Sequence, residues 1–238
     1  MHPSHWTTES RRKMASGSNL AGMDRALVEQ IVREVVLKKL GVNGKSLQST
    51  LVVQASSRHM HVCREDMDIL FGPGTELTPY RDLYQVGNYA AKEMVTIVGP
   101  RGRVISNLRI LGPMRKQSQV ELAFTDAIIL GFSDIPVRLS GDIKDTPGAV
   151  IVGPKGVVEL KQGLIRAAIH VHMNPTEASF FGVTQGDRMK LRVGGASGLT
   201  FNNVHVRIDP TSRLNVHMDT DEANACGLHL TKDIELTK

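Results

Sequence analysis

The sequence predicts a mainly β fold: two pseudo-repeated β-barrel domains with short helices, plus an N-terminal amphipathic helix. From about residue 51 the chain consists of short runs rich in Val, Ile and Thr, separated by Gly and Pro. Helical stretches in this body are few and short, at about residues 63–71 and 175–182. A histidine motif near residue 60 recurs near residue 171, and internal repetition of this kind indicates a duplicated unit. We therefore expect one barrel over residues 49–145 and a second over residues 146–238.

The N-terminal residues 1–48 differ in character from this body. Residues 1–22 are polar and lack the apolar core of a signal peptide. Residues 23–42 then place Leu and Val at helical spacing on one stripe, with Asp24 able to cap the start and Gly41 at the end. A polar segment separates this predicted helix from the first strand. The pattern leaves two interpretations open: a terminal helix packed on the body, or a detachable docking helix.

Composition narrows the functional classes. A chain of 238 residues can form two compact units, and no apolar run approaches the roughly 18 residues that a membrane span needs. The formal charge of +5 suits anionic small molecules, whereas three Tyr, one Trp and six Phe supply few stacking platforms for nucleic acid. Two cysteines form no disulfide framework, which favours a reducing compartment. We therefore expect a cytoplasmic protein that binds neither membrane nor nucleic acid.

The repeated motif is a pair of histidines two residues apart. His59 and His61 recur as His170 and His172, and each pair is followed about ten residues later by an apolar residue, Phe and Gly. Further along, Arg109 aligns with Arg207, and with one gap Glu121 aligns with His217. Each half of the body thus offers two histidines and one further residue of a metal-ligating type.

In a strand, residues i and i+2 project from the same face, so each pair presents two imidazoles side by side. A third ligand on a neighbouring strand would complete a three-ligand set with an open position, the pattern of catalytic zinc sites. The predicted sets are His59, His61 and Glu121 in the first half, and His170, His172 and His217 in the second. The alternative is that these are structural histidines, an interpretation that the duplication of the whole set disfavours.

A basic turn lies between the ligands of the first half. Gly112 and Pro113 form a turn, and Arg115 and Lys116 follow it a few residues before Glu121. The planar donors of an arginine match the oxygens of a phosphate or carboxylate. Arg115 is therefore a candidate catalytic residue, with a solvated basic turn as the alternative.

Taken together, these stretches resemble the PduL family of phosphotransacylases, the phosphate propanoyltransferases of bacterial microcompartments. The resemblance covers about residues 50–236 and rests on the motifs S57-RHMH61, L70-FGPG74, L77-TPYRDLYQ85, L111-GPMRKQSQVE121, T125-DA127, S140-GD142, H170-VHM173 and H217-MDTDEANA225. It implies two β-barrel domains and a site with two zinc ions, held by the same two ligand sets, with Arg115 contacting phosphate. It also implies that residues 23–42 act as an encapsulation peptide. Two departures are Ile169, where the family commonly has an arginine, and Cys63-Arg64 at the start of a helix.

The resemblance implies a phosphate acyltransferase that interconverts short-chain acyl-CoA, of the propanoyl-CoA type, plus phosphate with acyl phosphate plus coenzyme A. It further implies a homo-oligomer in a microcompartment lumen, bound to shell or cargo proteins through the N-terminal helix. Two other classes stay open. His59, His61, Glu65 and Gly72 resemble the first motif of cupins, which would imply a mononuclear metal oxygenase or isomerase. A non-catalytic scaffold stabilised by zinc is the other alternative.

Overall fold

The computed structural model describes residue 47 and residues 50–238. Contacts along the chain divide it into two units, Met1–Leu47 and Gln48–Lys238. The amphipathic helix predicted over residues 23–42 lies outside the described residues, and the fold below is that of the second unit.

The second unit is mainly β with a few short helices, which confirms that part of the predicted fold class. In the first part of the chain the elements are β1 (Val52–Ser56), β2 (His59–His61), α3 (Arg64–Phe71), β3 (Pro79–Asp82), β4 (Tyr89–Val98), β5 (Val104–Gly112), β6 (Gln119–Glu121), α4 (Phe124–Leu130) and β7 (Val137–Arg138). They continue as β8 (Ala149–Val152), β9 (Val157–Leu160), β10 (Leu164–Ala167), β11 (His170–Met173), α5 (Pro175–Phe181), β12 (Arg188–Val193), β13 (Leu199–Ile208), β14 (Asn215–Asp219), α6 (Thr220–Ala225), the 3₁₀ helix η1 (Leu228–Leu230) and β15 (Ile234–Thr237). Within the described part of the chain, no helix is long and apolar enough to cross a membrane.

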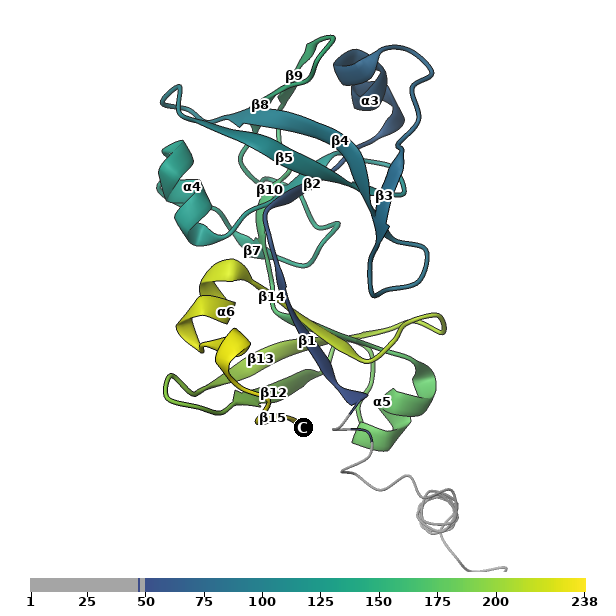
Figure 1. The fold of residues 1–238 in the computed structure, drawn as a ribbon, viewed down its shortest axis with the longest axis vertical. Coiled ribbons are helices and arrows are strands. Elements are labelled where there is room, and N and C mark those ends of the chain that lie inside the picture. The colour runs from purple at the N-terminus through teal and green to yellow at the C-terminus, as the bar shows by residue number, and fades with distance from the viewer. Residues whose placement is uncertain (1–46, 48–49) are drawn as a thin grey trace, which may run out of the picture. The chain divides into compact units, whose positions relative to one another are not determined.

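The strands form two curled sheets, each shaped like half of a barrel (Figure 1). The first has the order β7-β10-β6-β2-β5-β4-β8-β9, with β3 paired to β4, and the second has the order β1-β14-β11-β13-β12-β15. The run β10-β6-β2-β5-β4-β8 has the same sequence of parallel and antiparallel pairings as β1-β14-β11-β13-β12-β15. The repeat seen in the sequence is therefore a repeat of topology.

The two repeats exchange their first strands. β1 precedes β2 in the chain but pairs in parallel with β14 of the second sheet, and β10 precedes β11 but pairs in parallel with β6 of the first sheet (Figure 1). The sheets consequently do not divide at the expected boundary between residues 145 and 146, because β8, β9 and β10 follow that point and lie in the first sheet. The apolar pattern of a strand marks it as a strand but does not specify the edge at which it pairs, so the exchange could not be predicted.

Each sheet encloses its own apolar core, and this positions the histidines. Met60 and Val171, the middle residues of the two H-x-H motifs, are fully buried in the first and second core respectively. Because neighbouring side chains on a strand point to opposite faces, burial of the middle residue turns both flanking histidines to the other face. The hydrophobic core thus fixes the direction in which each imidazole pair points.

Candidate active site

The six residues predicted as metal ligands lie in two groups that face one cleft. In each group the potential ligand atoms lie within 4.8 Å of one another. The groups are those that the sequence predicted: His59, His61 and Glu121, and His170, His172 and His217.

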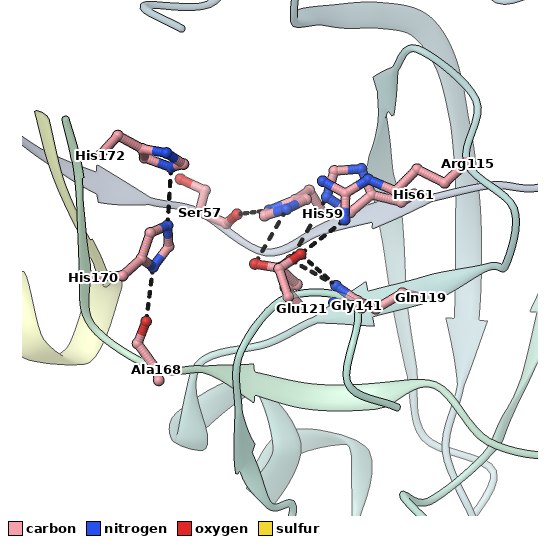
Figure 2. Close-up of polar contacts among 11 residues, drawn as sticks. Ser57, His59, His61, Arg115, Gln119, Glu121, Gly141, Ala168, His170 and His172 are labelled. Carbon is pink, nitrogen blue, oxygen red and sulfur yellow. Dashed lines mark hydrogen bonds and ion pairs between the residues drawn. The ribbon is translucent and has the colours of Figure 1, made fainter. Parts of the chain in front are cut away.

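In the first group a carboxylate faces two imidazoles. β2 and β6 are antiparallel, and their register places Glu121 directly opposite His59. The Glu121 Oε2 atom lies 3.5 Å from His59 Nε2, and Oε1 lies 3.6 Å from His61 Nε2 (Figure 2). All three side chains are buried. Three ligand atoms converging at these separations leave space for a cation between them.

In the second group three imidazoles converge. The register of β11 and β14 places His217 opposite His170, so the pairing bears out the alignment of Glu121 with His217. The Nε2 atoms of His170 and His172 lie 3.1 Å apart, and the buried Nε2 atom of His217 has no hydrogen-bond partner. An unpartnered buried nitrogen next to two facing nitrogens fits a set of lone pairs directed at one ion.

Backbone carbonyls fix the orientation of the first histidine in each group. His59 Nδ1 donates to the carbonyl oxygen of Ser57 at 2.8 Å, and His170 Nδ1 donates to that of Ala168, also at 2.8 Å (Figure 2). A carbonyl can only accept, so the proton of each neutral ring sits on Nδ1 and the lone pair on Nε2. A ligating histidine that donates its other nitrogen to a carbonyl is the usual arrangement in metal sites.

Electrostatics keep the imidazoles in the form that binds metals. Burial lowers the pKa of His61 to about 4, of His172 to about 3 and of His217 to about 4, and burial also lowers the pKa of His170. These rings are therefore neutral near pH 7, the state in which histidine ligates a metal. Burial alone would raise the pKa of Glu121, but His59, His61 and the Ser140 hydrogen bond hold that pKa below its ordinary value. The first group thus contains one ionised carboxylate, and the second contains no acidic residue.

A polar network orients the Glu121 carboxylate and ties it to Arg115. Glu121 Oε1 accepts hydrogen bonds from Gln119 Nε2 and from Ser140 Oγ, both at 2.7 Å. Arg115 Nη1 donates to Ser140 Oγ at 2.8 Å, and the backbone N–H of Gly141 donates to Gln119 Oε1 at 2.7 Å. The sequence analysis predicted no role for Gln119 or Ser140. Gln119 lies two residues before Glu121, and this spacing on a strand places the two side chains on the same face, so their contact could have been predicted.

The two groups line one cleft of about 820 Å³. Five arginines also line it: Arg58, Arg81, Arg109, Arg115 and Arg207. A concave surface with this many cations concentrates anionic solutes, which fits the phosphate-bearing substrates expected from the sequence. Cys63 and Glu65 belong to neither ligand group among the described residues, so the mononuclear cupin arrangement that would use Glu65 is not formed.

The strand register corrects one part of the sequence alignment. Arg109 pairs with His59 in the first sheet, whereas in the second His205 pairs with His170 and Arg207 pairs with His172. Arg109 and Arg207 are therefore not equivalent, because hydrogen-bond register, not identity of side chain, sets which positions correspond. Arg207 stands beside the second histidine of its pair.

The chain has Ile169 at the position that corresponds to Arg58 in the first repeat. In the structure Arg166 forms the corresponding ion pair of the second repeat. In the first repeat Arg58 forms an ion pair of 2.8 Å with Asp126 in the first turn of α4. In the second repeat Ile169 cannot do so, and Arg166 instead reaches the start of α6, with Nε 2.6 Å from Asp219 Oδ2 and an ion pair to Glu222. Asp219 is two residues beyond His217 on β14. The arginine thus anchors the end of the strand that carries a predicted ligand.

Replacing Arg166 with alanine is expected to lower the free energy of unfolding by about 1–3 kcal/mol, because it leaves a buried Asp219 carboxylate without its charged donor. Denaturant unfolding of the variant measures this, with Arg192→Ala as the matched control. Arg192 also pairs with two carboxylates, Asp233 and Glu235, but all three side chains are largely exposed, so its loss should cost much less than the loss of Arg166. Equal losses in the two variants would contradict the assigned role of Arg166.

Comparison with known proteins decides the family. The sequence pattern that defines the phosphate propanoyltransferases matches residues 52–229. The chain belongs to the phosphate propanoyltransferase family. A phosphate propanoyltransferase from Planctopirus limnophila is 49% identical over 236 residues, which cover 94% of this chain and 96% of that protein. Relatives with the same description from Thermotoga maritima and Salmonella typhimurium are 49% and 42% identical, covering 75% and 86% of this chain and 85% and 93% of theirs.

Membership of the phosphate propanoyltransferase family confirms the predicted resemblance and the prediction of an acyltransferase. Members of this family are phosphotransacylases. The family therefore supports neither the cupin alternative nor the scaffold alternative. The cationic cleft and the family description agree that the substrates are anionic.

Proposed function

We propose that the protein interconverts short-chain acyl-CoA, of the propanoyl-CoA type, plus phosphate with acyl phosphate plus coenzyme A, at a site that holds two zinc ions. The observation that carries this proposal is the pair of three-ligand groups on one cationic cleft, at equivalent positions of a duplicated fold. The family adds the reaction class, since its members are described as phosphate propanoyltransferases.

The residues of the two groups fit zinc. Their donor atoms are imidazole nitrogens and one carboxylate oxygen, both common zinc ligands, and three protein ligands leave a coordination position for a substrate. In this proposal His59, His61 and Glu121 hold one ion, and His170, His172 and His217 hold the other. Zinc, when bound, supplies Lewis-acid polarisation and favours the thiolate form of a bound thiol.

Arg115 is proposed to contact the phosphate group. Its side chain lines the cleft, and its hydrogen bond to Ser140 orients the guanidinium beside Glu121. The remaining donors of the fork are free to bind phosphate oxygens and to stabilise the charge of the departing phosphate. The residues beneath it, Ser140 and Gln119, hold Arg115 and Glu121 in fixed relative positions.

The reaction needs no side-chain nucleophile. The sulfur of coenzyme A, having lost its proton, attacks the carbonyl carbon of the acyl phosphate. A carbon–sulfur bond forms, the carbon–oxygen bond to phosphate breaks, and phosphate leaves with the electron pair. Placing both substrates in one cleft removes much of the entropic cost of this two-substrate reaction.

We also propose that residues 1–48 act as an encapsulation-peptide tail that binds shell or cargo proteins, and that the enzyme works as a homo-oligomer in a microcompartment lumen. The apolar stripe over residues 23–42 and the family resemblance support this proposal. The alignment with the Planctopirus limnophila relative covers 94% of the chain, a share that must include part of this N-terminal segment.

The test is an assay of coenzyme A release from propanoyl-CoA, with free thiol as the readout, in the presence and absence of phosphate. Release should require phosphate, stop after treatment with a chelator and return on addition of zinc. Release that ignores phosphate would contradict the proposal. So would a protein that loses its fold on chelation and transfers no acyl group at any zinc concentration, since that behaviour belongs to a zinc-stabilised scaffold.

A further inference from the structure

Arg207 lies beside the second ligand group and has no partner for its side chain. It is half-buried on β13, and the parallel register with β11 places it next to His172. Side chains at paired positions of adjacent strands share a face, so the guanidinium lies on the same face as the imidazole. Within residues 50–238 it forms neither a hydrogen bond nor an ion pair.

Three of the other four arginines of the cleft are already engaged, and the fourth, Arg81, is exposed on β3. Arg58 pairs with Asp126, Arg115 donates to Ser140, and Arg109 donates to the carbonyl of Ala91 and stacks over the Tyr80 ring. A half-buried guanidinium with no protein partner has all its donors available, and a bound anion would supply the missing counter-charge.

Arg207 and Arg115 line the same cleft but belong to different parts of the fold. Arg115 follows β5 of the first sheet, Arg207 lies on β13 of the second, and both line the cleft of about 820 Å³. Desolvation lowers the pKa of Arg115, the Glu121 carboxylate raises it, and the positive charge of Arg207 lowers it again, as expected of two cations that line one cleft. Two guanidinium groups that line one cleft match a ligand with more than one negative charge.

Arg207 is also open to a small solute from a second side. A neighbouring cavity of about 640 Å³ shares Gln85, Asn88, His172 and Arg207 with the cleft. Arg207 therefore stands where the two cavities adjoin, accessible to a small anion.

We propose that Arg207 is a second phosphate-binding residue, which contacts the phosphoryl group from the second sheet while Arg115 contacts it from the first. This inference rests on the proposed function. A tetrahedral phosphate has enough oxygens to accept from two guanidinium groups at once. Between free phosphate and the phosphates of coenzyme A, the position beside His172 favours the former, because the ligand groups mark the reactive end.

The experiment compares the wild-type protein with Arg207→Ala, Arg207→Lys and the control Arg188→Ala, an exposed arginine outside the cleft lining. For each, steady-state assays give separate KM values for phosphate and propanoyl-CoA, metal analysis gives the zinc content, and equilibrium dialysis with radiolabelled phosphate gives the affinity without turnover. Arg207→Ala should raise KM and Kd for phosphate at least about tenfold. The KM for propanoyl-CoA should stay within about twofold and the zinc content should not change. The KM and Kd for phosphate of Arg207→Lys should lie between those of the wild-type protein and those of Arg207→Ala. A lysine keeps the positive charge but lacks the planar donors of the guanidinium.

Three results would overturn the inference: an unchanged KM for phosphate in Arg207→Ala, a change confined to the KM for propanoyl-CoA, or a loss of zinc. The second would place the contact on the phosphates of coenzyme A, and the third would make the residue structural. Failure of the proposed function would give a different result from failure of this inference. In that case the wild-type protein itself shows no phosphate-dependent release, and the dialysis still decides whether Arg207 binds phosphate.

Discussion

Replacing Glu121 with alanine is expected to lower the transferase rate at least about 100-fold and to reduce the zinc content from about two ions per chain to about one. The substitution removes the carboxylate of the first group, its proposed anionic ligand, and the acceptor of the Gln119 and Ser140 hydrogen bonds. His217→Ala should give the same two losses through the second group, because His217 occupies the equivalent position opposite His170. The measurements are the rate of phosphate-dependent release of coenzyme A and elemental analysis of the purified variants.

The matched control is His229→Ala, which removes an exposed histidine of η1 outside both groups and should change neither quantity. Full rate and full zinc content in Glu121→Ala would refute the assignment of the first group. Loss of all zinc in both variants would contradict two independent ions and would instead point to one shared site.

Replacing Arg115 with alanine should lower kcat/KM for phosphate about 10²–10³-fold, the usual effect of removing a donor that stabilises developing charge. Unlike the ligand variants, this one should keep its zinc, because the hydrogen bond of the Arg115 side chain is to the Ser140 hydroxyl and not to a candidate ligand. Arg115→Lys should recover part of the rate, since a lysine supplies the charge without the bidentate geometry.

The readouts are the kinetic constants for each substrate and the zinc content measured on the same samples. An Arg115→Ala protein with an unaltered kcat/KM for phosphate would show that the basic turn is only a solvated surface feature. A variant that lost zinc along with activity would show that Arg115 supports the ligands and does not contact substrate.

The grouping of the six candidate ligands was predictable because it depends on short-range periodicity. The i, i+2 spacing in H-x-H fixes a shared strand face, and the buried Met60 and Val171 between the histidines leave no other orientation. Glu121 and His217 could be found because the duplication offered two copies to compare. In each sheet the third residue then lies opposite the first histidine of its pair.

Features that depend on which strands pair were not predictable. The exchange of β1 and β10 between the sheets, and with it the failure of a boundary at residue 145, comes from long-range pairing that no local pattern encodes. Arg207 pairs with His172, two residues beyond the position that corresponds to Arg109. This register also depends on long-range strand pairing. Arg166 was missed because its partners Asp219 and Glu222 are more than 50 positions away in the chain.

The most direct test of two ligand groups on one cleft is the zinc content of freshly purified wild-type protein, determined by elemental analysis on samples assayed for phosphate-dependent release of coenzyme A from propanoyl-CoA. The arrangement of His59, His61 and Glu121 with His170, His172 and His217 predicts about two zinc ions per chain, and activity proportional to the content of the second ion. One ion or none in a fully active protein would contradict it.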